Sequence, residues 1–135
     1  MKIYFKSGYK YQLSEDYIFQ ISEDFNSVIY SSPYLEVNGF TIKMKRGYCS
    51  DGASFPAIDT KSFIRGAYEH DCLYQLIRQG VFPEHHRKLA DQQLIKTCKE
   101  DGMMWARRKW VYHGLRVGGK KAASQKSIRK TRSAP

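Results

Sequence analysis

The feature that most constrains the fold of this 135-residue chain is a change in its hydrophobic period near the middle. Residues 1–48 consist of short β-branched and aromatic runs separated by polar turns, a pattern typical of strands. From residue 62 onward, apolar side chains recur every three or four positions, as they do on one face of a helix. Because the strands come first and the helices later, the order predicts an α+β domain and not alternating βαβ units.

The strongest local signal in the β-rich part is Asn38-Gly39, which lies between two alternating runs. Asn-Gly accepts the positive φ angles of a two-residue type I′ turn, so we expect an antiparallel hairpin with that turn. Alternation along the second strand places Phe40, Ile42 and Met44 on one face. Further strands are expected at 3–5, 17–21 and 28–30.

Three helices are expected after an irregular connection at 49–61, and local signals mark their ends. Ser62 is a good N-cap, Pro83 suits the first turn of a helix, and glycines at 80 and 102 are typical helix stops. The expected spans are about 62–79, 83–102 and 103–117. The side chains expected to share one face are Phe63, Ala67, His70, Tyr74 and Ile77 in the first helix, Arg87, Ala90, Asp91, Leu94 and Cys98 in the second, and Ala106, Trp110, His113 and Val117 in the third.

The positive charge of the chain is concentrated at its C-terminal end. The net charge is +10, and residues 118–135 contain six Lys or Arg but no acidic residue. This segment is rich in small and charged residues, so we expect a flexible basic tail attached to a single domain at 1–117. The candidates for contact with nucleic acid or an acidic partner are Lys120, Lys121, Lys126, Arg129, Lys130 and Arg132.

The cysteines and the apolar runs exclude some classes of protein. Cys49, Cys72 and Cys98 are odd in number and have no CxxC spacing, so we expect free thiols in a reducing cytosol. The N-terminal stretch lacks the order of a signal peptide, and the longest apolar runs are too short for a membrane span.

Polar residues occupy helix positions where an ordinary core would carry leucine. His70 lies in the apolar stripe of the first helix, with Asp71 beside it and Tyr74 one turn later. Asp91 lies on the inward face of the second helix, four residues after Arg87. The connection between these helices is short, so we expect them to pack antiparallel. Similar distances from that connection then bring His70, Asp71 and Asp91 to the same level.

A further acidic residue, Asp51, lies with Ser54 in a segment of small residues whose backbone could approach a ligand closely. A histidine oriented by a carboxylate can act as a general base on water. A set of carboxylates with a histidine can instead hold Ca²⁺, Mg²⁺ or Mn²⁺. The candidate site therefore comprises His70, Asp71 and Asp91 as catalytic residues, Asp51 and Asp71 as metal ligands, and Ser54, Tyr74 and Arg87 in support.

Other interpretations of these residues are also open. The same polar set could be a buried hydrogen-bonded network that only fastens the segment of small residues to two helices, with Arg87 and Asp91 as an intrahelical pair. Cys49 or Cys72 could form a thiol–imidazole pair with His70, although neither carries a mark of activation. The remaining histidines are expected at the solvated start of the second helix (His85 and His86) and at the core or rim of the third (His113).

Four segments follow one another along the chain: Gly47-Tyr-Cys-Ser-Asp51-Gly-Ala-Ser54-x-Pro56, His70-Asp71-x-Leu73-Tyr74, Arg87-x-x-Ala90-Asp91 and Trp110-Val-Tyr112-x-x-Leu-Arg116. Together they resemble a phage-encoded family known as domain of unknown function 1353. The resemblance covers roughly residues 35–118 and implies a phage or prophage origin, commonly among virion or tail genes, with no established activity. It implies a structural or accessory protein that is made in the host cytoplasm, joins the virion and contacts other virion or tail proteins.

A second, looser resemblance concerns the candidate site. His70-Asp71-x-x-Tyr74, followed by an acidic residue on the next antiparallel helix, is similar to secreted phospholipases. In that family the histidine activates water, the adjacent aspartate binds Ca²⁺ and the later acid orients the histidine, which would give these roles to His70, Asp71 and Asp91. The chain lacks the flanking disulfide cysteines and the glycine-rich calcium loop of that family.

Three functions are therefore open. The first is a phage virion or tail-associated structural or accessory protein. The second is a small metal-assisted hydrolase directed at the bacterial envelope or cell wall. The third is an accessory nucleic-acid-binding protein whose basic tail contacts phosphates.

Overall fold

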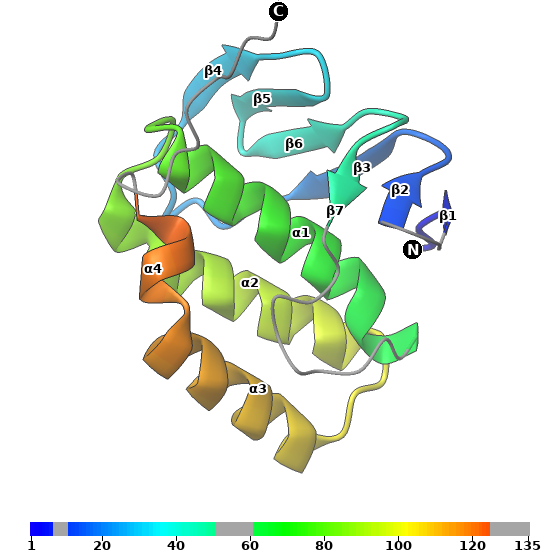
Figure 1. Ribbon diagram of the computed structural model, residues 1–135, viewed down its shortest axis with the longest axis vertical. Helices are drawn as coiled ribbons and strands as arrows, with labels where there is room; N and C mark the ends of the chain where they lie inside the picture. The colour runs from blue at the N-terminus through cyan, green and yellow to red at the C-terminus, as the bar shows by residue number, and fades with distance from the viewer. Residues whose placement is uncertain (7–10, 51–60, 125–135) are drawn as a thin grey trace, which may run out of the picture.

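The computed structural model describes residues 1–6, 11–50 and 61–124 (Figure 1). Its seven strands and four helices in this part of the chain confirm the predicted α+β class. The strands are β1 (Phe5–Lys6), β2 (Tyr11–Leu13), β3 (Tyr17–Gln20), β4 (Val28–Ser31), β5 (Leu35–Gly39), β6 (Thr41–Met44) and β7 (Cys49–Ser50). The helices are α1 (Lys61–Arg78), α2 (Arg87–Glu100), α3 (Trp105–Gly118) and α4 (Lys120–Ala123), and a 3₁₀ turn, η1 (Glu84–His86), precedes α2.

The strands form two antiparallel sheets. The larger sheet has the order β3-β6-β5-β4, and its strands include the hairpin and the two runs near residues 17 and 28 expected from the sequence. The smaller sheet has the order β1-β2-β7. The sequence did not predict β2 or β7, because two- and three-residue strands carry almost no alternation of their own.

The predicted type I′ turn of the hairpin is wrong. Asn38 pairs with Thr41, so the two loop residues are Gly39 and Phe40. Gly39 has a φ of 66°, and among the described residues only glycines have positive φ. A type I′ turn needs two positive φ angles, whereas glycine at the first loop position suits type II′. The predicted alternation is confirmed, because Ile42 is fully buried and so is the residue two positions later.

Helix α1 is buried from two sides and forms the centre of the domain. It lies between the four-stranded sheet and α2, and α3 lies beyond α2 (Figure 1). One core joins the sheet to α1, and a second joins α1, α2 and α3. At Gly66 the two central helices come so close that an added Cβ would lie 3.0 Å from Sγ of Cys98.

The predicted ends of the helices agree with the structure to within a few residues. Gly80 and Gly102 follow α1 and α2 with φ angles of 80° and 89°, as helix stops require. The expected second helix is divided, because the residues after Pro83 form η1 before α2 begins at Arg87.

The predicted inward face of the third helix is wrong. Ala106, Trp110, His113 and Val117 are all exposed, and Val111 and Leu115 are the buried residues of α3. Both sets have helical spacing, so the periodicity alone did not decide between them. The aliphatic pair packs into the core shared with α2, which leaves both indoles of the helix exposed.

The packed body extends beyond residue 117, where the sequence placed the start of the tail. Gly119 is buried between Tyr74 and α3, and Ala123 in α4 is buried in the main core. Lys120 is exposed and Lys121 belongs to α4. The other four basic candidates, Lys126, Arg129, Lys130 and Arg132, lie outside the described residues, as do Asp51 and Ser54. No helix in the described part of the chain is long and apolar enough to cross a membrane.

Candidate functional site

The candidate site is centred on the carboxylate of Asp91, which is fully buried on α2. Its Oδ1 lies 2.8 Å from Nε2 of His70 and accepts a 2.6 Å hydrogen bond from the Tyr74 hydroxyl, both residues of α1. Its Oδ2 accepts a 2.8 Å hydrogen bond from Nη1 of Arg116 on α3. One carboxylate thus joins three helices, and His70 and Asp91 meet across the antiparallel α1–α2 pair.

The partners of Asp91 keep its carboxyl group ionised. Burial raises the pKa of this carboxyl, but hydrogen bonds from His70, Tyr74 and Arg116 outweigh burial and hold its pKa below the usual value. Burial and the adjacent carboxylate raise the pKa of the Tyr74 phenol, so this hydroxyl stays a donor. An anionic Asp91 accepts hydrogen bonds and donates none, and Nε2 of His70 must therefore carry the proton.

His70 carries a proton on Nε2 and is largely shielded from solvent. The residue is 7% exposed, and its ring packs against that of Tyr74 with centroids 4.0 Å apart. No hydrogen bond joins Nδ1 to another described residue. Because Nε2 donates its hydrogen bond to Asp91, the lone pair of a neutral imidazole lies on Nδ1, where it can accept a proton.

Arg87 and Gly119 close the site from the C-terminal side. Nη1 of Arg87 donates a 3.0 Å hydrogen bond to the carbonyl of Leu115 and lies 3.9 Å from Oδ2 of Asp91, one helical turn away. It thereby links the expected intrahelical pair to the last turn of α3, where the helix dipole favours a cation. A Cβ on Gly119 would lie 2.5 Å from the Tyr74 hydroxyl and 2.7 Å from the Leu115 carbonyl, so only glycine fits there.

The predicted cation ligands are not assembled within the described residues. Asp71 is partly exposed on α1, next to His70, while Asp51 lies outside the described residues. In residues 1–6, 11–50 and 61–124, no group of three His, Cys, Asp or Glu side chains lies close enough to hold a metal ion. The divalent cation therefore stays a prediction.

Two histidines differ from their expected positions. His113 is exposed on α3, because Val111 and Leu115 take the buried side. His86, expected at the solvated surface, is 3% exposed and packs against aromatic rings. Its Nε2 accepts a 3.0 Å hydrogen bond from the backbone N–H of Asn26, which ties η1 to the segment between β3 and β4.

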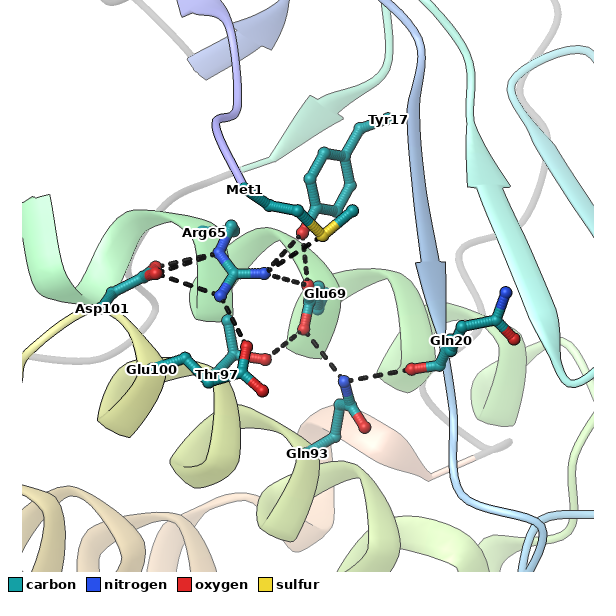
Figure 2. Close-up of polar contacts among 9 residues, drawn as sticks. All are labelled: Met1, Tyr17, Gln20, Arg65, Glu69, Gln93, Thr97, Glu100 and Asp101. Atoms are coloured by element: carbon teal, nitrogen blue, oxygen red, sulfur yellow. Dashed lines mark hydrogen bonds and ion pairs between the residues drawn. The ribbon is translucent and has the colours of Figure 1, made fainter.

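A second buried network, which the sequence did not predict, surrounds Glu69 (Figure 2). Glu69 is only 1% exposed and directly precedes His70. Its Oε1 accepts hydrogen bonds from Thr97 at 2.5 Å and Gln93 at 3.1 Å, both on α2. Its Oε2 accepts a 2.6 Å hydrogen bond from the hydroxyl of Tyr17 on β3. Burial raises the pKa of Glu69, and these bonds offset only part of that rise.

Arg65 connects this network to the end of α2. Its Nη1 donates to the Tyr17 hydroxyl at 3.0 Å and lies 3.6 Å from Oε2 of Glu69. Its Nε and Nη2 bind the carboxylates of Asp101 and Glu100 at 3.0 and 2.9 Å (Figure 2). An Arg–Glu pair four residues apart is usually a solvated surface pair, so no pattern in the sequence indicates that this one is buried.

The two networks differ in their chemistry. Both carboxylate oxygens of Glu69 accept hydrogen bonds from described side chains. Asp91 instead contacts a histidine whose second nitrogen is not bonded to any described residue. The Glu69 network thus fastens β3, α1 and α2 together, whereas the Asp91 network also contains a group that can exchange a proton.

No protein-family model matches the chain, and no match was found among curated proteins or among solved structures. The resemblance to the phage family therefore stays a prediction.

Proposed function

We propose that the protein is a hydrolase of envelope esters in which His70 acts as the general base on water. The observation that carries the proposal is the 2.8 Å contact between Nε2 of His70 and a fully buried Asp91 carboxylate. Tyr74 and Arg116 hold that carboxylate from two other directions. A carboxylate held in this way fixes the orientation of the imidazole and its tautomer.

In the proposed reaction, Nδ1 of His70 removes a proton from water as the water oxygen bonds to the ester carbonyl carbon. The bond from that carbon to the alcohol oxygen then breaks, and Nδ1 returns the proton to the departing alkoxide. Between these steps the imidazolium is stabilised by the anionic Asp91. Positioned general base catalysis of this kind contributes about 10²- to 10⁴-fold to a rate.

The order of residues at the site supports a phospholipid ester as the substrate class. His70, the adjacent Asp71, Tyr74 and the later Asp91 follow the pattern that resembles secreted phospholipases. We propose that Asp71 and Asp51 supply carboxylates to a divalent cation that polarises the substrate. Calcium titration by calorimetry on the full chain tests this cation, with Asp71→Asn expected to weaken binding at least tenfold.

Release of fatty acid from short-chain phospholipid micelles by the full chain tests the proposed activity. The variant His70→Asn is expected to lose at least 100-fold of the rate. His85→Asn is the matched control, because His85 is exposed on η1, and it should keep the wild-type rate. Equal rates for the wild type and His70→Asn, or no release above the spontaneous rate, would contradict the proposal.

The virion and nucleic-acid hypotheses stay separate proposals with their own tests. Mass spectrometry of purified particles should find the chain at fixed copy number if it is a virion or tail component, and absence from particles counts against that role.

DNA binding by the tail is tested by truncation. Because Ala123 is buried in the core, the informative truncation ends at Ser124 and not at residue 118. Unchanged DNA affinity after that truncation would exclude the tail as the binding segment.

A further inference from the structure

The outward face of α3 carries an unusual amount of exposed apolar surface. Four of the nine large hydrophobic side chains that are exposed in the described part of the chain lie between residues 104 and 117. Their exposed fractions are 77% for Met104, 62% for Trp105, 53% for Trp110 and 73% for Val117. Clustered apolar side chains on a surface helix mark a binding surface more often than isolated ones do.

The same helix is strongly basic. It contains Arg107, Arg108, Lys109 and Arg116, and it has no acidic residue. Arg116 donates a hydrogen bond to Asp91. The ammonium group of Lys109 lies 4.3 Å from the centre of the Trp105 ring. The exposed indole of Trp105 thus lies beside a positive charge, and the helix itself contributes no carboxylate.

A groove beside this face extends the surface toward α2. It has a volume of about 590 Å³ and is lined by Ile95 of α2 and by Trp105, Arg108, Lys109 and Tyr112 of α3, among others. None of its lining residues is acidic. The groove therefore combines apolar and aromatic walls with two cationic side chains.

We propose that the α3 face, defined by Trp105, Lys109, Trp110 and Val117 together with Met104 directly before the helix, docks on the surface of an anionic phospholipid bilayer. In-plane docking suits a helix that presents tryptophan and aliphatic side chains together with basic residues. Indoles are favoured at the headgroup level, where one part of the ring is apolar and the N–H is polar.

The charge pattern favours this occupant over nucleic acid. Arginine and tryptophan would also suit a single strand, in which bases stack on aromatic rings. Met104 and Val117, the two most exposed apolar side chains of the face, provide aliphatic surface that base stacking does not use. At a bilayer surface, the aliphatic side chains can contact the acyl chains while the cationic side chains contact the phosphates above them.

The proposed surface is separate from the chemistry of His70. Helix α3 lies on the side of α2 away from the four-stranded sheet (Figure 1), and its links to the Asp91 network are Arg116 and the Leu115 carbonyl that Arg87 binds. Docking could occur without hydrolysis, and hydrolysis of soluble esters could occur without docking. The two proposals can therefore fail independently.

Tryptophan fluorescence of the full chain is a direct probe, because Trp105 and Trp110 are the only tryptophans in the sequence. Vesicles of non-hydrolysable ether-linked phosphatidylcholine, with or without ether-linked phosphatidylglycerol, serve as the bilayer. With the anionic vesicles we expect a blue shift of the emission and quenching by brominated lipid. Vesicles of phosphatidylcholine alone should produce little of either.

Charge-reversal variants connect the binding to α3. A basic residue near an anionic surface contributes about fivefold to affinity, so Lys109→Glu, at an exposed position of the α3 face, should weaken binding at least fivefold. The matched control is Lys43→Glu on β6, in the sheet on the other side of α1, and it should change affinity little. Thermal melts of all variants confirm that they are folded.

Three outcomes would overturn the proposal. The first is no binding to anionic vesicles. The second is cosedimentation with vesicles while the tryptophan emission stays unchanged, which would assign binding to the basic tail. The third is stronger tryptophan quenching by a single-stranded oligonucleotide than by vesicles of equal charge. The variant His70→Asn should bind vesicles like the wild type, which separates this test from that of the hydrolase.

Discussion

Replacing the carboxylate of Asp91 with an amide is the perturbation whose effect the structure defines best. The substitution Asp91→Asn keeps the size of the side chain but leaves one acceptor oxygen where there were two. If the amide oxygen faces His70 and Tyr74, the amide N–H₂ faces the guanidinium of Arg116, and two donors oppose each other. The reverse orientation loses the bonds to His70 and Tyr74 instead.

The expected cost follows from these contacts. Loss of a hydrogen bond to a charged group costs about 1.5–3 kcal/mol, and removal of one partner from a buried ion pair costs about 3–5 kcal/mol. Arg116 is one-third exposed and can turn toward water, which favours the lower end of that range. We expect Asp91→Asn to lower the free energy of unfolding by about 3 kcal/mol. For a domain of this size the melting temperature should then fall by about 10 °C.

The stability difference should also depend on pH. The folded-state pKa of Asp91 is below its ordinary value of 3.8, so its stabilising effect is present above that value. The effect is lost as the pH falls through the folded-state pKa, and the two melting curves should converge in acid. Calorimetry from pH 7 to about pH 2 measures this, with Asp24→Asn at an exposed turn as the control. A melting temperature within 1 °C of the wild type at pH 7, or a difference that grows in acid, would refute the reasoning.

Three further predictions concern other parts of the fold. Burial and the neighbouring histidine lower the pKa of His86, so wild-type stability should decline as the pH falls below 6.5, and His86→Gln should lack that decline in denaturant titrations. Gly119→Ala should lower the free energy of unfolding by about 1–3 kcal/mol, because the new methyl group would overlap the Tyr74 hydroxyl; chemical denaturation measures it, and an unchanged midpoint would contradict the packing. In the native protein a thiol reagent should modify Cys49 quickly and the two buried cysteines only after unfolding, so three fast thiols would show that the core is open.

The sequence predicted those parts of the fold that depend on local periodicity. The switch from strands to helices and the buried stripe of α1 follow from side-chain spacing within single elements. Equal distances from the Gly80 connection anticipated that His70 and Asp91 would lie level, and they are in contact in the structure. These inferences needed only the geometry of one helix and one short loop.

Features that depend on distant packing were not predictable in this way. Arg65 and Glu69 look like an ordinary solvated pair until α1 is known to be covered from both sides. Arg116 reaches Asp91 from the third helix, and no local pattern shows which side of that helix faces inward. The same uncertainty led to the wrong prediction that Trp110 points inward. The exposed apolar face of α3 was therefore not predicted.

The central claim is that Asp91 holds His70 as a general base with its proton on Nε2. The ¹⁵N NMR spectrum of the His70 imidazole tests this most directly, with His70→Asn used for assignment and Asp91→Asn as the perturbed case. When the wild-type ring carries a single proton, we expect that proton on Nε2 with Nδ1 unprotonated, and we expect this preference to be lost in Asp91→Asn. A wild-type ring with its proton on Nδ1 would contradict the account, because the nitrogen proposed to accept a proton from water would already carry one.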